Sequence, residues 1–262
     1  MRKSRANGGA QAHTPTHPHR GYRVAGAVAL IAGSALIAAY IALACGSLLM
    51  ANQAARPDRH PLETTDNVQE GAEMNPIDWN YWLDVNEDIA AWVHIPGTEI
   101  EYPVVQATRD EPRFYLDHDV NRNWNLFGCP YLDAGCPAGI DSLNSVIVGH
   151  NISFPPAMFH DLENFVDPDF AREHLNAYIY TPAKVRSMKV AGVKTIAGWE
   201  PLKRVEFADE KDFALYYASL LDLCDESYYA KEAPERLVTL CSCSYYFNPD
   251  DERTLVFLVD DE

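Results

Sequence analysis

Basic residues are scarce in this chain once its first 23 residues are set aside. The sequence has 21 lysines and arginines against 38 aspartates and glutamates, and five of the basic residues fall within residues 1–23, which contain no acid. The rest therefore has 16 basic residues against 38 acidic ones, a net charge of about −22. Such a body repels the phosphate backbone, so nucleic acid is excluded as a partner.

Metal-ligand spacing and two familiar sequence patterns are also missing. Cys241 and Cys243 form a Cys-x-Cys pair without a second paired set, which is a poor zinc pattern. The Cys-Gly-Ser-Cys block of papain-like proteases, with its histidine far downstream, is absent. No internal repeat is present. We therefore expect neither a metal nor an organic cofactor.

The N-terminal part predicts a membrane anchor. Residues 1–23 are polar and basic, and residues 24–50 run for 27 positions without a charge, longer than the roughly 20 needed to cross a bilayer as a helix. The positive charges before this run predict a cytoplasmic N-terminus and an extracellular remainder. The alternative is a cleaved signal peptide, for which the alanine-rich exit at 51–55 leaves room. Residues 51–74 indicate a linker, and residues 75–262 a single catalytic domain.

Beyond residue 75 the patterns favour a mostly β fold. Apolar residues from Ile77 to Trp92 recur at helical spacing after Asn75-Pro76, and the ranges 156–166 and 209–224 also predict helices. About eight short runs predict strands and hence a mostly antiparallel barrel. These runs are 92–95, 100–105, 125–132, 142–148, 177–180, 188–196, 236–243 and 253–259.

The last two predicted strands place Cys243 and Arg253 at neighbouring strand ends. A guanidinium beside a thiol favours the thiolate, which is the nucleophilic form. The missing base is supplied by His150, the one histidine that follows a buried-strand run, at Gly149. Cys241 is two residues from Cys243 and so lies on the same strand face, which leaves either thiol able to point toward the site.

Cys243 and Arg253 also have simpler interpretations. A single cysteine such as Cys243 is most often a small buried hydrophobe. Arg253 follows three acidic residues and could pair with them in a surface loop.

Cys129 and Cys136, in a loop rich in Gly and Pro, could form a disulfide or remain two free thiols, since spacing alone does not decide disulfide geometry.

Taken together, several segments resemble the class B sortases, the membrane-anchored cysteine transpeptidases of Gram-positive cell walls. The catalytic blocks are Val148-Gly149-His150-Asn151, Thr239-Leu240-Cys241-Ser242-Cys243, in which Ser242 replaces the family's threonine, and Arg253. Two further matching segments are 91–105 and 157–162, and the resemblance runs from about residue 75 to the C-terminus.

The resemblance implies a fold, a site and partners. The fold is an eight-stranded sortase-type barrel with N-terminal helices and a helix before the catalytic strand. Cys243 is the nucleophile, His150 the acid and base, and Arg253 the hydrogen-bond donor to the substrate and the oxyanion. The partners are a sorting-signal peptide, of the Asn-Pro-x-Thr-x type in class B, and an amine of the peptidoglycan precursor. Two alternatives stay open: a cysteine peptidase that transfers the acyl group to water, and a non-catalytic surface binding module.

Overall fold

The computed structural model describes residues 31–46, 75–200, 202–229, 234–244 and 251–261, with only the backbone at 243 and 244. Residues 31–46 are helical and form a unit separate from the body that begins at residue 75. Of the described helices, none combines the length and apolar character that a membrane crossing requires. The predicted span 24–50 extends past both ends of the described helix, and the predicted tail (1–23) and linker (51–74) lie outside the described residues.

Eight strands of the body close into a barrel, as the sequence predicts. Their order is β11-β10-β4-β3-β2-β1-β7-β8, and β8 pairs with β11 to complete the ring. The bounds are β1 (Ile89–His94), β2 (Glu101–Gln106), β3 (Tyr131–Leu132), β4 (Asn144–Gly149), β7 (Asn176–Tyr180), β8 (Val185–Ala197), β10 (Leu237–Ser244) and β11 (Glu252–Asp260). The short β9 (Glu226–Ser227) adds to β8, and β5 (Asn151–Ser153) and β6 (Pro156–Met158) form a separate hairpin.

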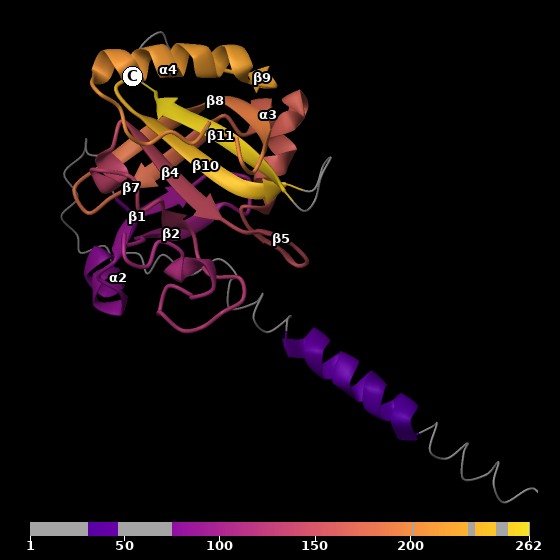
Figure 1. Ribbon diagram of the computed structural model, residues 1–262. Coiled ribbons are helices and arrows are strands. Elements are labelled where there is room, and N and C mark those ends of the chain that lie inside the picture. The colour runs from indigo at the N-terminus through magenta and orange to yellow at the C-terminus, as the bar shows by residue number, and fades with distance from the viewer. Residues whose placement is uncertain (1–30, 47–74, 201, 230–233, 245–250, 262) are drawn as a thin grey trace, which may run out of the picture. The chain divides into compact units, whose positions relative to one another are not determined.

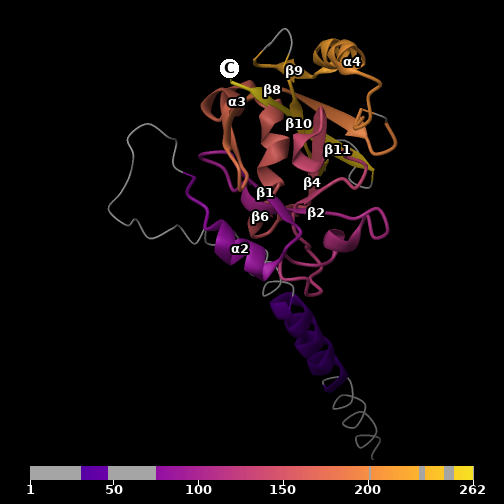
Figure 2. The same ribbon diagram turned by 90° about the vertical axis from the view of Figure 1, so that its left-hand side faces the viewer.

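Helices cover the barrel from outside, which explains why the central strands are apolar on both faces. Residues 254–259 of β11 are all buried, without the alternation of a half-exposed strand. The 3-10 helix η3 (His160–Val166) packs against β10 and β11, and α4 (Glu210–Leu223) packs against β8. Figures 1 and 2 show α4 on one side of the barrel and α2 (Trp79–Val85) on the opposite side.

The predicted N-terminal helix is shorter than its apolar spacing indicates. Asp78 caps α2 by accepting a hydrogen bond from the Tyr81 amide, and the helix ends at Val85. Ile89 and Trp92 instead belong to β1, where both side chains are buried. The prediction of one helix through Trp92 is therefore wrong, because helical spacing coincided with residues that the barrel core buries from a strand.

Three other segments bear on the secondary-structure predictions. The range 156–166 is not one helix but strand β6 followed by η3, and the predicted strand 125–132 is reduced to Tyr131–Leu132. The helix α3 (Pro168–Glu173) was not predicted. The helix before the last two strands is confirmed as α4, whose Asp209 cap accepts from the Asp212 amide.

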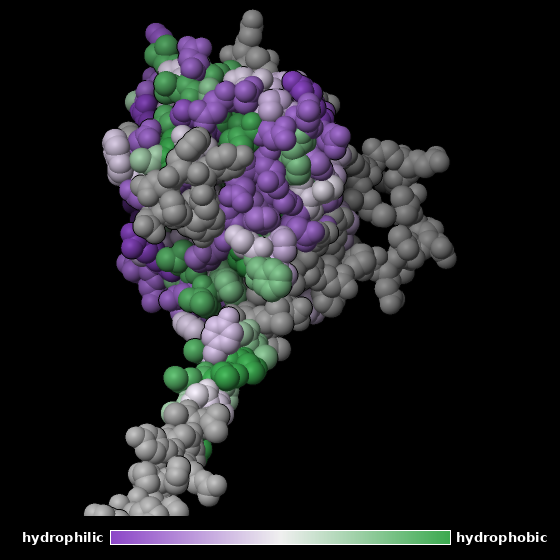
Figure 3. All heavy atoms as spheres, turned by 90° about the vertical axis from the view of Figure 1, so that its right-hand side faces the viewer, coloured by the Kyte–Doolittle hydropathy of each residue, from purple (hydrophilic) through white to green (hydrophobic). Residues whose placement is uncertain are grey.

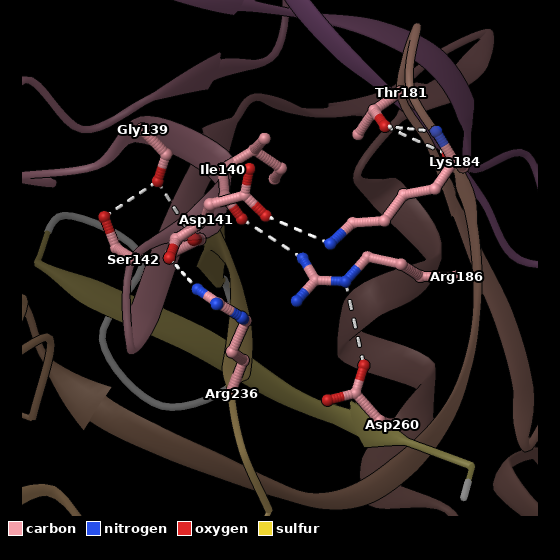
Figure 4. A network of polar contacts seen from close by, with 10 residues as sticks. Gly139, Ile140, Asp141, Ser142, Thr181, Lys184, Arg186, Arg236 and Asp260 are labelled. Carbon is pink, nitrogen blue, oxygen red and sulfur yellow. Dashed lines mark hydrogen bonds and ion pairs between the residues drawn. The ribbon is translucent and has the colours of Figure 1, made fainter. Parts of the chain in front are cut away.

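A polar network holds the end of the barrel where β10 begins (Figure 4). Arg186 is almost fully buried, lies 3.7 Å from Asp260 on β11, and donates to the Ile140 carbonyl at 3.2 Å. Arg236 donates to the Asp141 carbonyl, and Lys184 lies 3.4 Å from the Asp141 carboxylate. The network ties the starts of β8 and β10 to the end of β11, and so fixes the strand register from the end opposite to residues 149, 243 and 253.

Candidate active site

Three neighbouring strands bring the backbones of the predicted site residues to one end of the barrel. Cys243 on β10 lies opposite Arg253 on β11 in the antiparallel register. The strand on the other side of β10 is β4, which runs parallel to it, with Gly149 opposite Ser242 as the last pair. His150 follows Gly149 directly, so it emerges beside Cys243. Figure 1 shows the ends of β4 and β10 on the same side of the barrel as the β5 hairpin.

The structure describes the side chain of only one of the two cysteines of β10. Cys241 is 1% exposed and belongs to the main hydrophobic core. Of the two thiols that the sequence left as candidates, that of Cys241 is therefore enclosed in the core. The side chain of Cys243 lies outside the described part of the chain, so its assignment as nucleophile rests on the strand register and on the sequence.

His150 is held by a backbone carbonyl of the 107–130 loop, which connects β2 to β3. Its Nε2 lies 2.9 Å from the carbonyl oxygen of Leu116, at the end of the 3-10 helix η1 (Phe114–Leu116). A carbonyl oxygen only accepts hydrogen bonds, so Nε2 is the donor. When His150 is neutral, its proton therefore sits on Nε2, and Nδ1 is left as the nitrogen that takes and returns a proton.

Arg253 makes no ion pair within the described part of the chain; its Nη1 donates to the carbonyl of Glu252 at 2.7 Å. The interpretation of Arg253 as a surface ion-pair residue thus finds no support among the described acids. Its side chain is half-buried, at the second residue of the terminal strand β11. The remaining donors of its guanidinium are suited to binding a carbonyl oxygen or an oxyanion.

Two buried hydroxyls lie one position along the strands from Cys243 and Arg253. Ser242 and Thr254 are opposite each other in the register, and each is 1% exposed. Neither hydroxyl has a hydrogen-bond partner among the described residues. Ser242, which stands in place of the threonine of the sortase-like block, therefore carries a buried hydroxyl.

The other cysteines of the body have poorly nucleophilic thiols. Cys129, Cys136 and Cys224 are all free, so the two free thiols expected as an alternative to a Cys129–Cys136 disulfide are observed. Burial raises the pKa of Cys136 and of Cys224 to about 11, and raises the pKa of Cys129 well above its usual value. Within the described ranges, no group of three or more His, Cys, Asp or Glu side chains could hold a metal ion.

Exposed apolar side chains surround the site end of the barrel. Phe154, in the hairpin that follows His150, is 84% exposed, and Trp199, just after β8, is 78% exposed. The 107–130 loop adds Leu116, Trp124 and Leu126, with Trp124 59% exposed. Figure 3 views this side of the body and shows green apolar atoms interrupting the purple hydrophilic surface. An extended peptide with apolar side chains would find contacts on such a surface.

The sequence did not predict the role of the Leu116 carbonyl. A backbone carbonyl has no side-chain signature, and Leu116 lies 34 positions before His150. The nearest available signal was the loop's length between two strands, since long loops in compact domains are often functional.

Comparisons with known proteins find similar sequences. No family model matches the chain. The chain is 25% identical over 163 residues to Sortase B of Listeria monocytogenes, covering 61% of this chain and 64% of that protein, which is slightly under two thirds of its length. Sortase B of Staphylococcus aureus is 22% identical over 177 residues, covering 66% of this chain and 70% of that protein.

Solved structures share the fold. Clostridium perfringens sortase B matches with a TM-score of 0.63 and 23% identity, covering 70% of this chain and 99% of that one. A Staphylococcus aureus sortase B–substrate complex matches with a TM-score of 0.60 and 19% identity, covering 70% of this chain and 85% of that one. A sortase B complexed with triglycine gives the same TM-score and identity and covers 86% of that chain.

Proposed function

We propose that this chain is a class B sortase, which cleaves the C-terminal sorting signal of surface proteins and joins the acyl group to an amine of a peptidoglycan precursor. The observation that carries the proposal is the register that places Cys243 opposite Arg253, with His150 emerging from the strand on the other side of β10. A thiol, an imidazole and a guanidinium at one strand end supply a nucleophile, a proton carrier and an oxyanion donor.

The first half-reaction forms a thioester. The Cys243 thiolate attacks the scissile carbonyl carbon, and Arg253 donates hydrogen bonds to the oxygen as it gains negative charge. The carbon–nitrogen bond then breaks, and the leaving amine takes a proton from the imidazolium of His150. With Nε2 bonded to the Leu116 carbonyl, Nδ1 is the nitrogen that delivers this proton.

The second half-reaction releases the product. The acceptor amine attacks the thioester, His150 takes the proton from that amine at Nδ1, and Cys243 leaves as the thiolate. Because the first product departs before the acceptor reacts, ping-pong kinetics follow. No metal or organic cofactor enters either step.

The substrates are proposed from the class B relationship. We assign the peptide as a sorting signal of the Asn-Pro-x-Thr-x type. The acceptor is an N-terminal glycine or another primary amine, a class supported by the complexes of sortase B proteins with a substrate and with triglycine. The exposed apolar residues around the site provide a surface for the peptide's side chains.

The location is proposed from the sequence. The enzyme is a single-pass membrane protein anchored by residues 24–50, with its N-terminus in the cytoplasm and residues 75–262 outside the cell. The uncharged run and the five basic residues before it support this arrangement, and residues 31–46 within the run are helical. Protease accessibility of the body on intact cells tests the orientation.

Peptide transfer tests the function. Full-length protein in detergent is incubated with Asn-Pro-x-Thr-x and Leu-Pro-x-Thr-Gly peptides and triglycine, and products are identified by mass spectrometry. Cys243→Ala, His150→Ala and Arg253→Ala each abolish transfer, whereas Cys241→Ala largely retains it. Transfer that survives in Cys243→Ala overturns the proposal. Cleavage that ignores triglycine and yields only the free acid indicates a hydrolytic peptidase instead.

A further inference from the structure

A buried tyrosine adjoins the carbonyl that binds His150. Tyr115 precedes Leu116 in η1 and is 2% exposed. Its hydroxyl donates to Asp88 Oδ2 at 2.5 Å and accepts from Asn86 Nδ2 at 2.9 Å. Burial, followed by the hydrogen bond to Asp88, raises the pKa of Tyr115 well above its usual value, so the hydroxyl stays protonated and remains a donor.

Asp88 and Asn86 hold the 107–130 loop to the barrel at more than one point. Asn86 Nδ2 also donates to the Val120 carbonyl at 2.9 Å, and Arg122 lies 3.4 Å from the Asp88 carboxylate. Asn86 and Asp88 both lie in the three-residue junction between α2 and β1. We call Asn86, Asp88 and Tyr115 the loop anchor. It connects the junction between α2 and β1 to the helical turn that ends at Leu116.

Gly128 packs closely against the backbone carbonyls of Tyr115 and Leu116. A Cβ on Gly128 would lie 2.2 Å from the Tyr115 carbonyl oxygen and 2.6 Å from that of Leu116, and its φ of +53° also favours glycine. The Cys129 amide donates to the Tyr115 carbonyl at 3.1 Å. The backbone at 115 and 116 is therefore enclosed, with little space to rotate the Leu116 carbonyl away from His150.

We propose that Tyr115 is a positioning residue for the transpeptidation: through the loop anchor it directs the Leu116 carbonyl at Nε2 of His150, which leaves Nδ1 to face the reacting groups. The inference rests on the proposed function for its effect on rate, and on geometry alone for its effect on the histidine. Tyr115 acts through the imidazole and touches no substrate. Small displacements of a proton carrier reduce turnover strongly, because the reacting atoms must lie within about 3–3.5 Å.

The test compares Tyr115→Phe with a matched tyrosine variant in the full-length protein. Tyr115→Phe keeps the buried ring and removes only the hydroxyl that donates to Asp88. Tyr216→Phe is the control: Tyr216 is a half-buried tyrosine of α4 whose hydroxyl donates to the Leu202 carbonyl at 2.6 Å. Asp88→Ala removes the same hydrogen bond from the acceptor side and so checks that the effect belongs to the pair.

Two readouts separate positioning from general damage. Long-range proton–nitrogen NMR on histidine-labelled protein, with the His150 signals assigned by His150→Gln, reports which ring nitrogen carries the proton. Wild type and Tyr216→Phe show the Nε2–H form, whereas Tyr115→Phe and Asp88→Ala show a mixture of both forms. In the transfer assay, kcat falls about tenfold in Tyr115→Phe, with KM changed by less than about twofold, because substrate contacts are untouched.

Failure of this inference is distinguishable from failure of the proposed function. A neutral His150 protonated on Nδ1 in wild type overturns the inference, and so does an unchanged proton position together with an unchanged kcat in Tyr115→Phe. If wild type transfers no peptide, the proposed function fails, and the NMR comparison alone decides whether Tyr115 positions His150. A fall in kcat that is equal in Tyr216→Phe also contradicts the proposal, since it reports loss of a hydroxyl anywhere in the body.

Discussion

Cys243 and Arg253 are direct cross-strand partners, one on each of the last two strands of the chain. Opposite residues of an antiparallel pair have Cβ atoms about 4.5–5.5 Å apart. The ten positions that separate the two residues in the sequence thus bring a cysteine and an arginine together through a simple two-stranded connection. The activity and stability expected of variants at the site and in the barrel follow from this pairing and from the strands and loops around it.

Lysine does not replace Arg253. A guanidinium offers five donors in a fixed plane, and one of these already contacts the Glu252 carbonyl, whereas an ammonium is a compact charge with three donors. We expect Arg253→Lys to lower kcat/KM about 100-fold, which is a typical fall in rate when an enzyme loses one hydrogen-bond donor to the oxyanion. Steady-state transfer kinetics measure it, and a variant with more than about half of wild-type activity would show that charge alone suffices.

Thiol labelling at neutral pH should be confined to Cys243 once the exposed Cys45 is replaced by alanine. With a pKa of about 11, fewer than about one in 10³ of the Cys136 and Cys224 side chains are thiolate at pH 7. Peptide mapping after treatment with a vinyl sulfone reports the labelled position. Modification of Cys136 or Cys224 at a rate similar to Cys243 would contradict the assignment, and an inert Cys243 would favour a non-catalytic module.

The stability of the body falls as the pH rises above the pKa of an unfolded cysteine. Burial raises the pKa of Cys129, Cys136 and Cys224 in the folded state, so the unfolded chain releases these protons first. The three buried neutral thiols therefore contribute fully to the free energy of unfolding below about pH 8.5, and this contribution is lost as the pH rises from there toward 11. Urea denaturation at pH 8 and pH 10 measures the difference. Cys136→Ala reduces this pH dependence, and a flat profile between the two pH values argues against buried neutral thiols.

Alanine at position 149 disturbs the residue that leads into His150. A Cβ there would lie 2.7 Å from the ring of Phe159, which is fully buried and has little room to move. Overpacking of this kind costs about 1–3 kcal/mol of unfolding free energy. Denaturation gives the stability, and the transfer assay shows whether kcat falls further than the loss of folded protein explains. Wild-type stability in Gly149→Ala would mean that Phe159 yields without strain.

The Arg186–Asp260 pair contributes to stability and not to chemistry. Removing one partner leaves the almost fully buried guanidinium without its carboxylate, and the loss for a fully buried pair is about 3–5 kcal/mol. Because Asp260 is a quarter exposed, we expect about 2–3 kcal/mol for Asp260→Ala, with kcat unchanged in the folded fraction. The control is Arg172→Ala, which breaks an exposed pair with Asp169 and costs less than about 1 kcal/mol. Equal losses in the two variants would contradict the role of burial.

Local patterns in the sequence were sufficient for the elements that carry the site. The apolar runs around Leu240 and Val256 predict strands where the structure has β10 and β11. Apolar residues at helical spacing, among them Phe213 and Tyr217, predict a helix where the structure has α4. The position of His150 after a buried run ending at Gly149 also agrees with the end of β4. These features depend on neighbouring residues and on periodic burial, which the order of amino acids states directly.

Other features were decided only when the barrel closed. Ile89 and Trp92 continue a helical spacing, yet both lie in β1. This segment is a strand because its backbone pairs with β2 on one side and with β7 on the other. Whether Cys129 and Cys136 pair, and which residues cover both faces of β11, likewise depends on segments distant in the sequence.

The sequence by itself determined the three candidate side chains and the strands that carry them, because a cysteine, a histidine and an arginine can be read directly from the sequence and strand periodicity is local. The tertiary structure decided that the backbone of Cys243 lies opposite that of Arg253 in a strand pair and that the Leu116 carbonyl accepts a hydrogen bond from Nε2 of His150. Strand pairing and a loop carbonyl are set by contacts between residues far apart in the chain, and a carbonyl is the same at every position, so neither can be recognised from residue types alone.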